Sequence, residues 1–270
     1  MLQKRILTAV LLFIGLIGCL FWLPQPAWWV VMLLPLVASM VEWGRLAGLS
    51  AAPLVAYVAL GSLLTVAAWH GGGSVWLYAA SLVLWLLIVP VWLAAGWKIR
   101  SLWLHLPLGF LVLAPLWSAL IELRARGPWW LLLLMGLVWV ADSAAYFSGK
   151  AFGRHKLAPL ISPGKTWEGV AGALIGVLLY SGMILWLFAS HQFEPRVWMT
   201  PIMLLAILML YLSIIGDLFE SWIKRLADVK DSGNLLPGHG GILDRVDALT
   251  STLPVAALIL LHSDVLRSWS

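Results

Sequence analysis

Nine apolar runs, each about as long as a membrane-spanning helix, dominate this sequence. A helix needs about 20 apolar residues to cross the hydrocarbon of a bilayer, where no backbone polar group can be left unpaired. The runs predict helices over residues 6–23, 27–41, 51–69, 74–95, 101–121, 128–148, 167–190, 198–217 and 250–266. The second run is short and the last contains His262 and Asp264, so eight and ten spans are the alternatives. The expected fold is an all-α, polytopic integral membrane protein.

The composition excludes an ordinary water-soluble domain. Of the 270 residues, 62% are hydrophobic and 11% are charged, with a mean hydropathy of +0.96, whereas soluble domains carry about 25% charged residues. The single cysteine, Cys19, lies inside an apolar run and allows no intrachain disulfide. The N-terminal segment resembles a signal peptide, but its apolar core is long and no small-residue cleavage site follows, so we expect a retained first span.

The basic residues predict the orientation in the membrane. A net charge of +5 would suggest nucleic-acid binding in a soluble protein, but these Lys and Arg residues lie in short loops between spans, so we expect no nucleic-acid partner. With nine spans and a cytoplasmic N-terminus, thirteen of the 17 basic residues face the cytoplasm and four face outward: Arg124, Arg126, Arg196 and Arg267. This excess follows the positive-inside rule, and it puts the polar loops 149–166 and 218–249 on the cytoplasmic face.

The acidic residues divide the chain into two regions. Within residues 1–140 only Glu42 and Glu122 are acidic, whereas ten acidic residues fall within 141–270. We therefore expect residues 1–127 to be a scaffold of transmembrane helices. Residues 128–270 should form the catalytic region with its two cytoplasmic loops.

Two polar segments lie between residues 139 and 176. Asp142 follows an apolar run, and an unpartnered carboxylate in the membrane costs roughly 3 kcal/mol or more, which predicts a polar interior around it; a helix-packing Asp bonded to Ser or Tyr is the alternative. Further on, Pro163 and Gly164 predict a turn, Thr166 predicts a helix cap, and Lys165 stands where free N–H groups favour phosphate. An ordinary capped helix with a snorkelling Lys165 is the alternative there. The GKT string is not a P-loop, because the first glycine of that motif is missing and no strand is expected before it.

The third polar segment, residues 217–247, is the most charged part of the chain. Asp217 closes an apolar run, and Glu220, Lys224 and Asp228 follow at helical spacing, which is typical of ion pairs along a solvated helix face. The sequence LLPGHGGILDRVD then places His239 in a glycine-rich turn whose N–H groups can wrap an anion.

Asp244 and Asp247 are three residues apart, so they share one face of a helix that begins there. Their position at the cytoplasmic mouth of the last span lets them meet Asp217 across the bundle. Facing carboxylates repel and take up protons unless a cation holds them. Oxygen ligands without Cys favour a hard ion such as Mg²⁺, whose shell is completed by water and substrate phosphates, and nearby Lys and Arg would bind those phosphates. The pattern predicts metal-assisted phosphoryl or nucleotidyl transfer at the membrane surface.

The stretch S-W-I-K-R-x4-K-D-x-G-x2-L-P-G-H-G-G-I-x-D-R-V-D, residues 221–247, resembles the signature of phosphatidate cytidylyltransferases, also called CDP-diacylglycerol synthases. The upstream stretch DSAAYFSGKAFGRHKLAPLISPGKTWEG, residues 142–169, resembles a second block of that family, with Ser143 and Ala144 where Thr-Gly is expected. The resemblance covers about residues 142–250, and the first 130 residues match only in being helical and membrane-bound.

The resemblance implies cytidylyl transfer from CTP to phosphatidic acid, giving CDP-diacylglycerol and pyrophosphate for phospholipid synthesis. It also implies Mg²⁺, with a second cation left open. The expected metal ligands are Asp217 and Asp244, followed by Asp247 and Asp231. The expected catalytic residues are Asp217, Asp244, Asp247, His239 and Lys224.

Within that reaction, we expect Lys165 and Ser162 to hold the CTP phosphates at the helix start. Lys224, Arg225 and Arg245 would bind the lipid phosphate or the departing pyrophosphate, and His239 would be a phosphate contact or leaving-group acid. The full set of expected substrate contacts is Ser162, Lys165, Arg225, Lys230, Arg245 and Asp142.

Two other functions are compatible with this pattern. A related enzyme acting on a different lipid phosphate would share the same residues. An ion-coupled transporter would also use an intramembrane Asp, but alternating access requires polar residues reachable from both faces, and here they gather on one. CDP-alcohol phosphotransferases are excluded because their D-x2-D-G-x2-A-R motif is absent. The resemblance suggests a homodimer, and we expect a multi-pass protein of the bacterial inner (plasma) membrane with a cytoplasmic active site.

Overall fold

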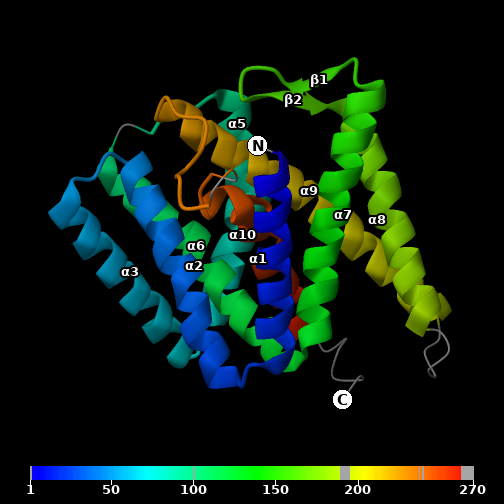
Figure 1. Ribbon diagram of the computed structural model, residues 1–270, viewed down its shortest axis with the longest axis horizontal. Coiled ribbons are helices and arrows are strands. Elements are labelled where there is room, and N and C mark those ends of the chain that lie inside the picture. The colour runs from blue at the N-terminus through cyan, green and yellow to red at the C-terminus, as the bar shows by residue number, and fades with distance from the viewer. Residues whose placement is uncertain (1, 100, 189–194, 237, 239, 263–270) are drawn as a thin grey trace.

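The protein is a bundle of long helices in a computed structural model, which describes residues 2–99, 101–188, 195–236, 238 and 240–262 (Figure 1). The helices of the first region are α1 (Leu2–Trp22), α2 (Gln25–Leu46), α3 (Ala51–His70), α4 (Ser74–Val83) and α6 (Leu102–Arg126). A π-helical turn, η1 (Leu84–Ile88), joins α4 to α5 (Val89–Ala95) in one continuous rod. The second region contains α7 (Pro128–Phe152), α8 (Trp167–Phe188), α9 (Pro195–Leu226) and α10 (Leu243–His262).

Within the described residues, each of the nine predicted apolar runs overlaps a helix or, for residues 74–95, the α4–η1–α5 rod. Residues 189–190 and 263–266 of two of these runs lie outside the described residues. Within the described part of the chain, seven of these helical segments are long and apolar enough to cross a membrane, and Val10–Trp22 of α1 forms a shorter apolar stretch. The protein is therefore a polytopic membrane protein that is almost entirely helical.

The all-α expectation is wrong in one detail. Strands β1 (Lys156–Ala158) and β2 (Ser162–Thr166) form an antiparallel hairpin between α7 and α8. The expected turn at Pro163 and Gly164 is also wrong, because both residues lie inside β2, and the hairpin turns before them, where the amide of Ile161 bonds the carbonyl of Ala158 at 3.1 Å. Strands of three and five residues are too short to leave an alternating pattern in the sequence.

The helices extend into the polar segments that were expected to be loops. The last turn of α7 lies inside 149–166, while the end of α9 and the start of α10 lie inside 218–249. Glu220 and Lys224 of these helix ends are buried inside the bundle, with 4% and 9% of the whole residue exposed, whereas Lys150, Arg225 and Arg245 are exposed. A span predicted from hydropathy ends at the first charged residue, whereas the helix itself continues beyond it.

The helix α6 is the most buried candidate span, and α3 is the least. The indole N–H of Trp28 in α2 bonds the carbonyl of Leu120 in α6 at 3.2 Å, and that of Trp43 bonds the carbonyl of His105 at 2.9 Å. The outer faces expose large apolar side chains such as Val55 and Leu63 of α3. An apolar outer face is what a helix presents to lipid.

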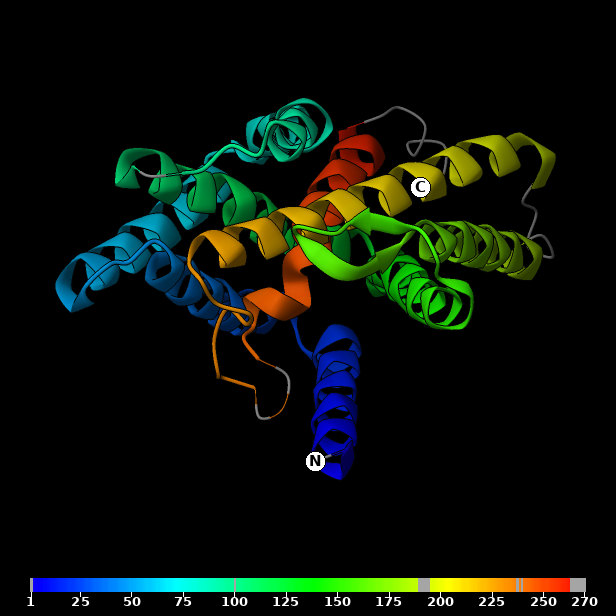
Figure 2. The same ribbon diagram turned by 90° about the horizontal axis from the view of Figure 1, so that it is seen from above.

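Two arrangements position the site. The 32-residue helix α9 crosses the molecule obliquely (Figures 1 and 2), and helices α7 and α8 stand side by side next to it. They pack closely because Gly172 and Gly176 of α8 face Ser148 and Ala144 of α7, where a Cβ on either glycine would lie under 3 Å from its neighbour. The β1–β2 hairpin connects the upper ends of α7 and α8 in Figure 1.

Candidate active site

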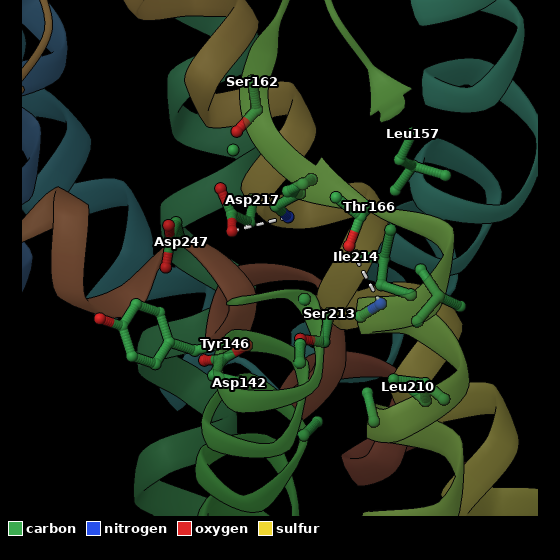
Figure 3. A pocket seen from close by; sticks show the side chains of 18 of the residues that line it. Asp142, Tyr146, Leu157, Ser162, Thr166, Leu210, Ser213, Ile214, Asp217 and Asp247 are labelled. Carbon is green, nitrogen blue, oxygen red and sulfur yellow. Dashed lines mark hydrogen bonds and ion pairs between the residues drawn. The ribbon is translucent and has the colours of Figure 1, made fainter. Parts of the chain in front are cut away.

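A cavity of about 560 Å³ lies between the β1–β2 hairpin and four helices, α7, α8, α9 and α10 (Figure 3). Its apolar lining includes Ala173, Leu210 and Ile214. Charged and hydroxyl side chains from four elements, α7, β2, α9 and α10, converge on it: Asp142, Lys150, Ser162, Lys165, Thr166, Ser213, Asp217, Asp244, Arg245 and Asp247. A concave site that combines apolar walls with a few convergent polar groups is the usual form of a small-molecule site.

The hairpin delivers Lys165 to the cavity. The ammonium of Lys165 pairs with Oδ2 of Asp217 at 2.7 Å, which joins β2 to α9. The residue after it, Thr166, caps α8 as expected, because its Oγ1 accepts a hydrogen bond from the amide of Gly169 at 3.1 Å. Just before the neighbouring strand, Nδ1 of His155 lies 2.6 Å from Oε1 of Glu168 and ties the start of β1 to α8. The contacts of Lys165 and His155 both hold the base of the hairpin, where Lys156 of β1 pairs with Thr166 of β2.

Three carboxylates from three helices face one another in the cavity: Asp142 of α7, Asp217 of α9 and Asp247 of α10 (Figure 3). The hydroxyl of Ser213 bonds Asp142, and that of Ser221 bonds Oδ1 of Asp217 at 3.3 Å. Burial, and then the negative charge of Asp217, raise the pKa of Asp247 to about 7. The cluster therefore carries more negative charge than Lys165 alone balances.

Asp244 is held differently from these three carboxylates. Its Oδ2 accepts hydrogen bonds from the amides of Ser232 (2.9 Å) and Gly241 (2.8 Å), and from the Ser232 hydroxyl (2.9 Å). Its Oδ1 receives the ammonium of Lys224 at 2.7 Å. Burial opposes ionisation, but the bonds from Lys224 and the two amides outweigh it and hold the pKa of Asp244 below its usual value.

Lys224 is bound by a second carboxylate, that of Glu220 one turn earlier in α9. The expected i,i+4 ion pair thus forms, but it is buried rather than along a solvated face. Glu220, Lys224 and Asp244 make a buried triad in which one ammonium lies between two carboxyl groups.

The donor set around the cavity fits a hard cation. Among the described residues, no group of three or more His, Cys, Asp or Glu side chains is arranged to hold a metal ion by itself. Mg²⁺ typically uses only one or two protein carboxylates and takes its other ligands from water and phosphates. Asp247 accepts a hydrogen bond from the amide of Ala248, and Asp217 is bound by Ser221 and Lys165. Asp244 already has four protein donors, so it has the least free capacity for a cation.

Comparison with known proteins relates the whole chain to one family. Residues 3–262 match the cytidylyltransferase family. This chain belongs to that family. It is 43% identical over 275 residues to a phosphatidate cytidylyltransferase of Pseudomonas aeruginosa, covering 96% of this chain and 97% of that protein. A phosphatidate cytidylyltransferase of Haemophilus influenzae is 34% identical over 281 residues, covering 94% of this chain and 96% of that protein. A third, from Brucella suis, is 48% identical over 132 residues, covering 49% of this chain and 45% of that protein.

Membership in the cytidylyltransferase family confirms the resemblance seen in the two sequence blocks. It also extends it, because the match begins in α1 rather than near residue 142. The first region of the chain is therefore related to cytidylyltransferases in sequence as well as in being helical.

The structure brings most of the expected site residues of this cytidylyltransferase to the cavity, but not all. Asp142, Ser162, Lys165, Asp217, Asp244, Arg245 and Asp247 line it. Lys224 lies behind Asp244 in the buried triad, and Arg225 is exposed and bonds the carbonyl of Val229 at 3.1 Å. Lys230 and Asp231 are exposed and do not line the cavity. His239 lies outside the described residues.

Sequence reasoning missed one residue, Glu42, which it assigned to the scaffold. Its carboxylate is fully buried and accepts hydrogen bonds from the amide of Leu243, the first residue of α10, and from the hydroxyl of Ser232, next to Asp244. A lone acid inside an apolar run was the available signal, because such residues are costly unless they have a partner.

Proposed function

We propose that this protein transfers a cytidylyl group from CTP to phosphatidic acid, giving CDP-diacylglycerol and pyrophosphate. The observation that carries the proposal is the match over nearly the whole chain to proteins named phosphatidate cytidylyltransferase. The cavity supports it, because it combines phosphate-binding cations with carboxylates at one end of a membrane bundle. Such a site suits one soluble and one membrane-embedded substrate.

The chemistry asks little of a general base. The phosphate oxygen of phosphatidic acid attacks the α-phosphorus of CTP, a new P–O bond forms, and the bond to the bridging oxygen breaks so that pyrophosphate leaves. The main difficulty is to bring two polyanions together in line, so charge neutralisation and alignment supply the catalysis. Lys165 and Ser162 on the hairpin would bind the CTP phosphates, and Arg245 and Lys150 would bind the lipid phosphate or the pyrophosphate.

Magnesium would be held by Asp217 and Asp247, with Asp142 beside them and Asp244 completing the acidic wall. When bound, it would neutralise phosphate charge and orient the phosphates. A second cation would suit the remaining carboxylates. Asp244, held by Lys224 and three donors of the loop, would fix the position of α10, and Lys165 would be released from Asp217 to bind phosphate.

The membrane orientation is part of the proposal. Nine crossings, with the ninth formed by the apolar part of α10 after residue 250, put the N-terminus and the cavity on the cytoplasmic side, where CTP is found. The excess of basic residues in the predicted cytoplasmic loops supports this orientation. We propose the bacterial inner membrane as the location and a homodimer as the assembly, both on the family resemblance. A reporter fused to residue 270 should be periplasmic, and a cytoplasmic reporter would overturn the orientation.

An assay with purified protein tests the reaction. With labelled CTP, Mg²⁺ and phosphatidic acid in mixed micelles, we expect a labelled lipid and an equal amount of pyrophosphate. EDTA should stop both, and excess Mg²⁺ should restore them. Asp217→Asn should lower the rate by at least about a hundredfold at an unchanged melting temperature, since one ligand of a site that must neutralise two polyanions is lost.

The outcome also separates the alternatives. No product from phosphatidic acid, with product from another lipid phosphate, would favour a related enzyme of different substrate. No CTP turnover with any lipid phosphate would refute the proposed reaction.

A further inference from the structure

Glu42 joins the first region of the chain to the candidate site. It lies near the C-terminal end of α2, and its side chain is completely buried. Its Oε1 accepts a hydrogen bond from the amide of Ile242 at 3.0 Å. Its Oε2 accepts bonds from the amide of Leu243 at 2.8 Å and from the hydroxyl of Ser232 at 2.9 Å. All three partners lie 190 or more residues later in the sequence.

These contacts cap α10 from another helix. The first N–H groups of a helix have no partner within the helix, and its N-terminus carries a partial positive charge, so a carboxylate there is stabilising. The caps of most helices come from the residue just before them. Here α10 begins at Leu243, and the carboxylate that takes its first amide comes from α2. The start of α10 is therefore anchored to the first region of the protein.

The same contacts reach Asp244. The hydroxyl of Ser232 lies 2.9 Å from both Glu42 Oε2 and Asp244 Oδ2. A hydroxyl has one proton to donate, so the two carboxylates share it. The backbone closes tightly around this pair, because a Cβ on Gly233 or Gly241 would lie under 3 Å from the Glu42 carboxylate.

We propose that Glu42 is a positioning residue that sets α10, and with it Asp244 and Asp247, against Asp217 across the cavity. Asp247 follows Leu243 by about one turn, so a shift at the start of α10 moves Asp247 relative to Asp217. The proposal rests on the cytidylyltransferase function proposed above. It predicts that a change at Glu42 affects kcat rather than the KM for CTP, because the hairpin that would bind CTP makes none of the contacts with Glu42 described here.

Three variants and one control test this role. Glu42→Gln keeps the shape but turns one acceptor into a donor facing backbone N–H groups. We expect kcat to fall about a hundredfold, as for a misplacement of about 1 Å, while KM for CTP stays within about threefold. Glu42→Asp keeps two acceptor oxygens and should recover about a tenth of wild-type kcat.

The control is Glu122→Gln, the same change at the other acidic residue of residues 1–140. Ile121, its neighbour in α6, accepts a bond from Gln25 at the opposite end of α2, about 25 Å from Glu42 along the helix. This variant should keep wild-type kcat and KM. A Glu42→Gln enzyme with kcat within threefold of wild type, or with KM for CTP raised in proportion to the loss of kcat, would overturn the proposal.

Ser232→Ala covers the case in which Glu42→Gln does not fold. It removes only the shared hydroxyl, so we expect about a tenfold loss of kcat at an unchanged melting temperature, and wild-type kcat would refute the role. Amide hydrogen exchange gives a readout that needs no turnover. The amides of Gly241, Ile242 and Leu243 should exchange at least about tenfold faster in the Glu42 variants than in Glu122→Gln. This result stands or falls independently of whether CTP is the substrate.

Discussion

Replacing Lys224 should lower the stability of the protein more than replacing either of its partners, Glu220 or Asp244. Its ammonium lies 2.7 Å from Asp244 Oδ1 and also pairs with Glu220, and the three side chains are 11%, 6% and 5% exposed, respectively. Lys224→Met would leave two buried carboxylates without their shared cation. Breaking a buried ion pair from one side costs about 3–5 kcal/mol, mostly because a charge stays buried and unpaired. At about 2–4 °C per kcal/mol for a chain of this size, the melting temperature should fall by roughly 6–20 °C.

The assay is thermal unfolding in detergent, followed by tryptophan fluorescence, on four variants. Glu220→Gln should be nearly neutral, because Lys224 keeps its bond to Asp244 and the amide keeps the size of the carboxyl group. The double variant Glu220→Gln/Lys224→Met should be more stable than Lys224→Met alone by about 1 kcal/mol or more, since only one carboxylate is left unpaired. Lys230→Met, an exposed lysine of the same segment, should stay within about 0.5 kcal/mol of wild type. A Lys224→Met protein as stable as the Lys230→Met protein would refute the reasoning about the triad.

Three further predictions concern the site and its loop. Without divalent cations, the protein should be more stable at pH 5 than at pH 8, because the pKa of Asp247 is raised to about 7 in the folded state. The folded state therefore binds an extra proton between about pH 4 and 7, and the stability that this proton gives is lost as the pH rises through 7. Unfolding in EDTA should show this dependence of stability on pH in wild type, and an unchanged dependence in Asp247→Asn would contradict it. Gly241→Ala should lower activity at least about tenfold and lower the melting temperature, because a Cβ there meets Ser232 and Glu42. The control Gly18→Ala, with open space around the glycine, should leave both measurements unchanged. Equal activities and melting temperatures of the two variants would contradict the close packing around Gly241. Lys165→Met should raise KM for CTP about tenfold or more, the range for one hydrogen bond to a charged group, with a smaller change in KM for phosphatidic acid; equal rises in both would show that Lys165 does not distinguish the two phosphates.

Hydropathy predicted where the helices lie but not where they end. Lipid requires long apolar runs, so each run is visible in the sequence alone. At Glu220, Lys224 and Asp244, however, the helices continue through charged residues that satisfy one another inside the bundle. No local pattern distinguishes such residues from a solvated loop. The hairpin escaped prediction because its strands are short and because its ion pair from Lys165 to Asp217 joins it to a helix distant in the sequence.

The candidate site was predictable as a collection of residues, although its pairings were not. Asp244 and Asp247 were expected to meet Asp217 because all three stand at the cytoplasmic ends of spans. Asp142 was expected to face a polar interior because a carboxylate in the membrane needs a partner. Asp244 is bound by protein donors, whereas Asp247 faces the cavity. This difference depends on side-chain geometry at the start of α10, which the sequence does not show. Glu42 was missed because all three of its hydrogen-bond donors lie in the last quarter of the chain.

The distance along the chain between Glu42 and its partners has a consequence for biogenesis. Leu243 is made 201 residues after Glu42, which is about 10–40 s later at a synthesis rate of 5–20 residues per second. During that interval α2 has entered the bilayer with a carboxylate that lacks its partners, so the group must be protonated or held at the headgroups until α10 is inserted. Insertion of α10 therefore supplies hydrogen-bond donors that α2 needs. A nascent chain released before residue 243 would leave the Glu42 carboxylate without the amide of Leu243.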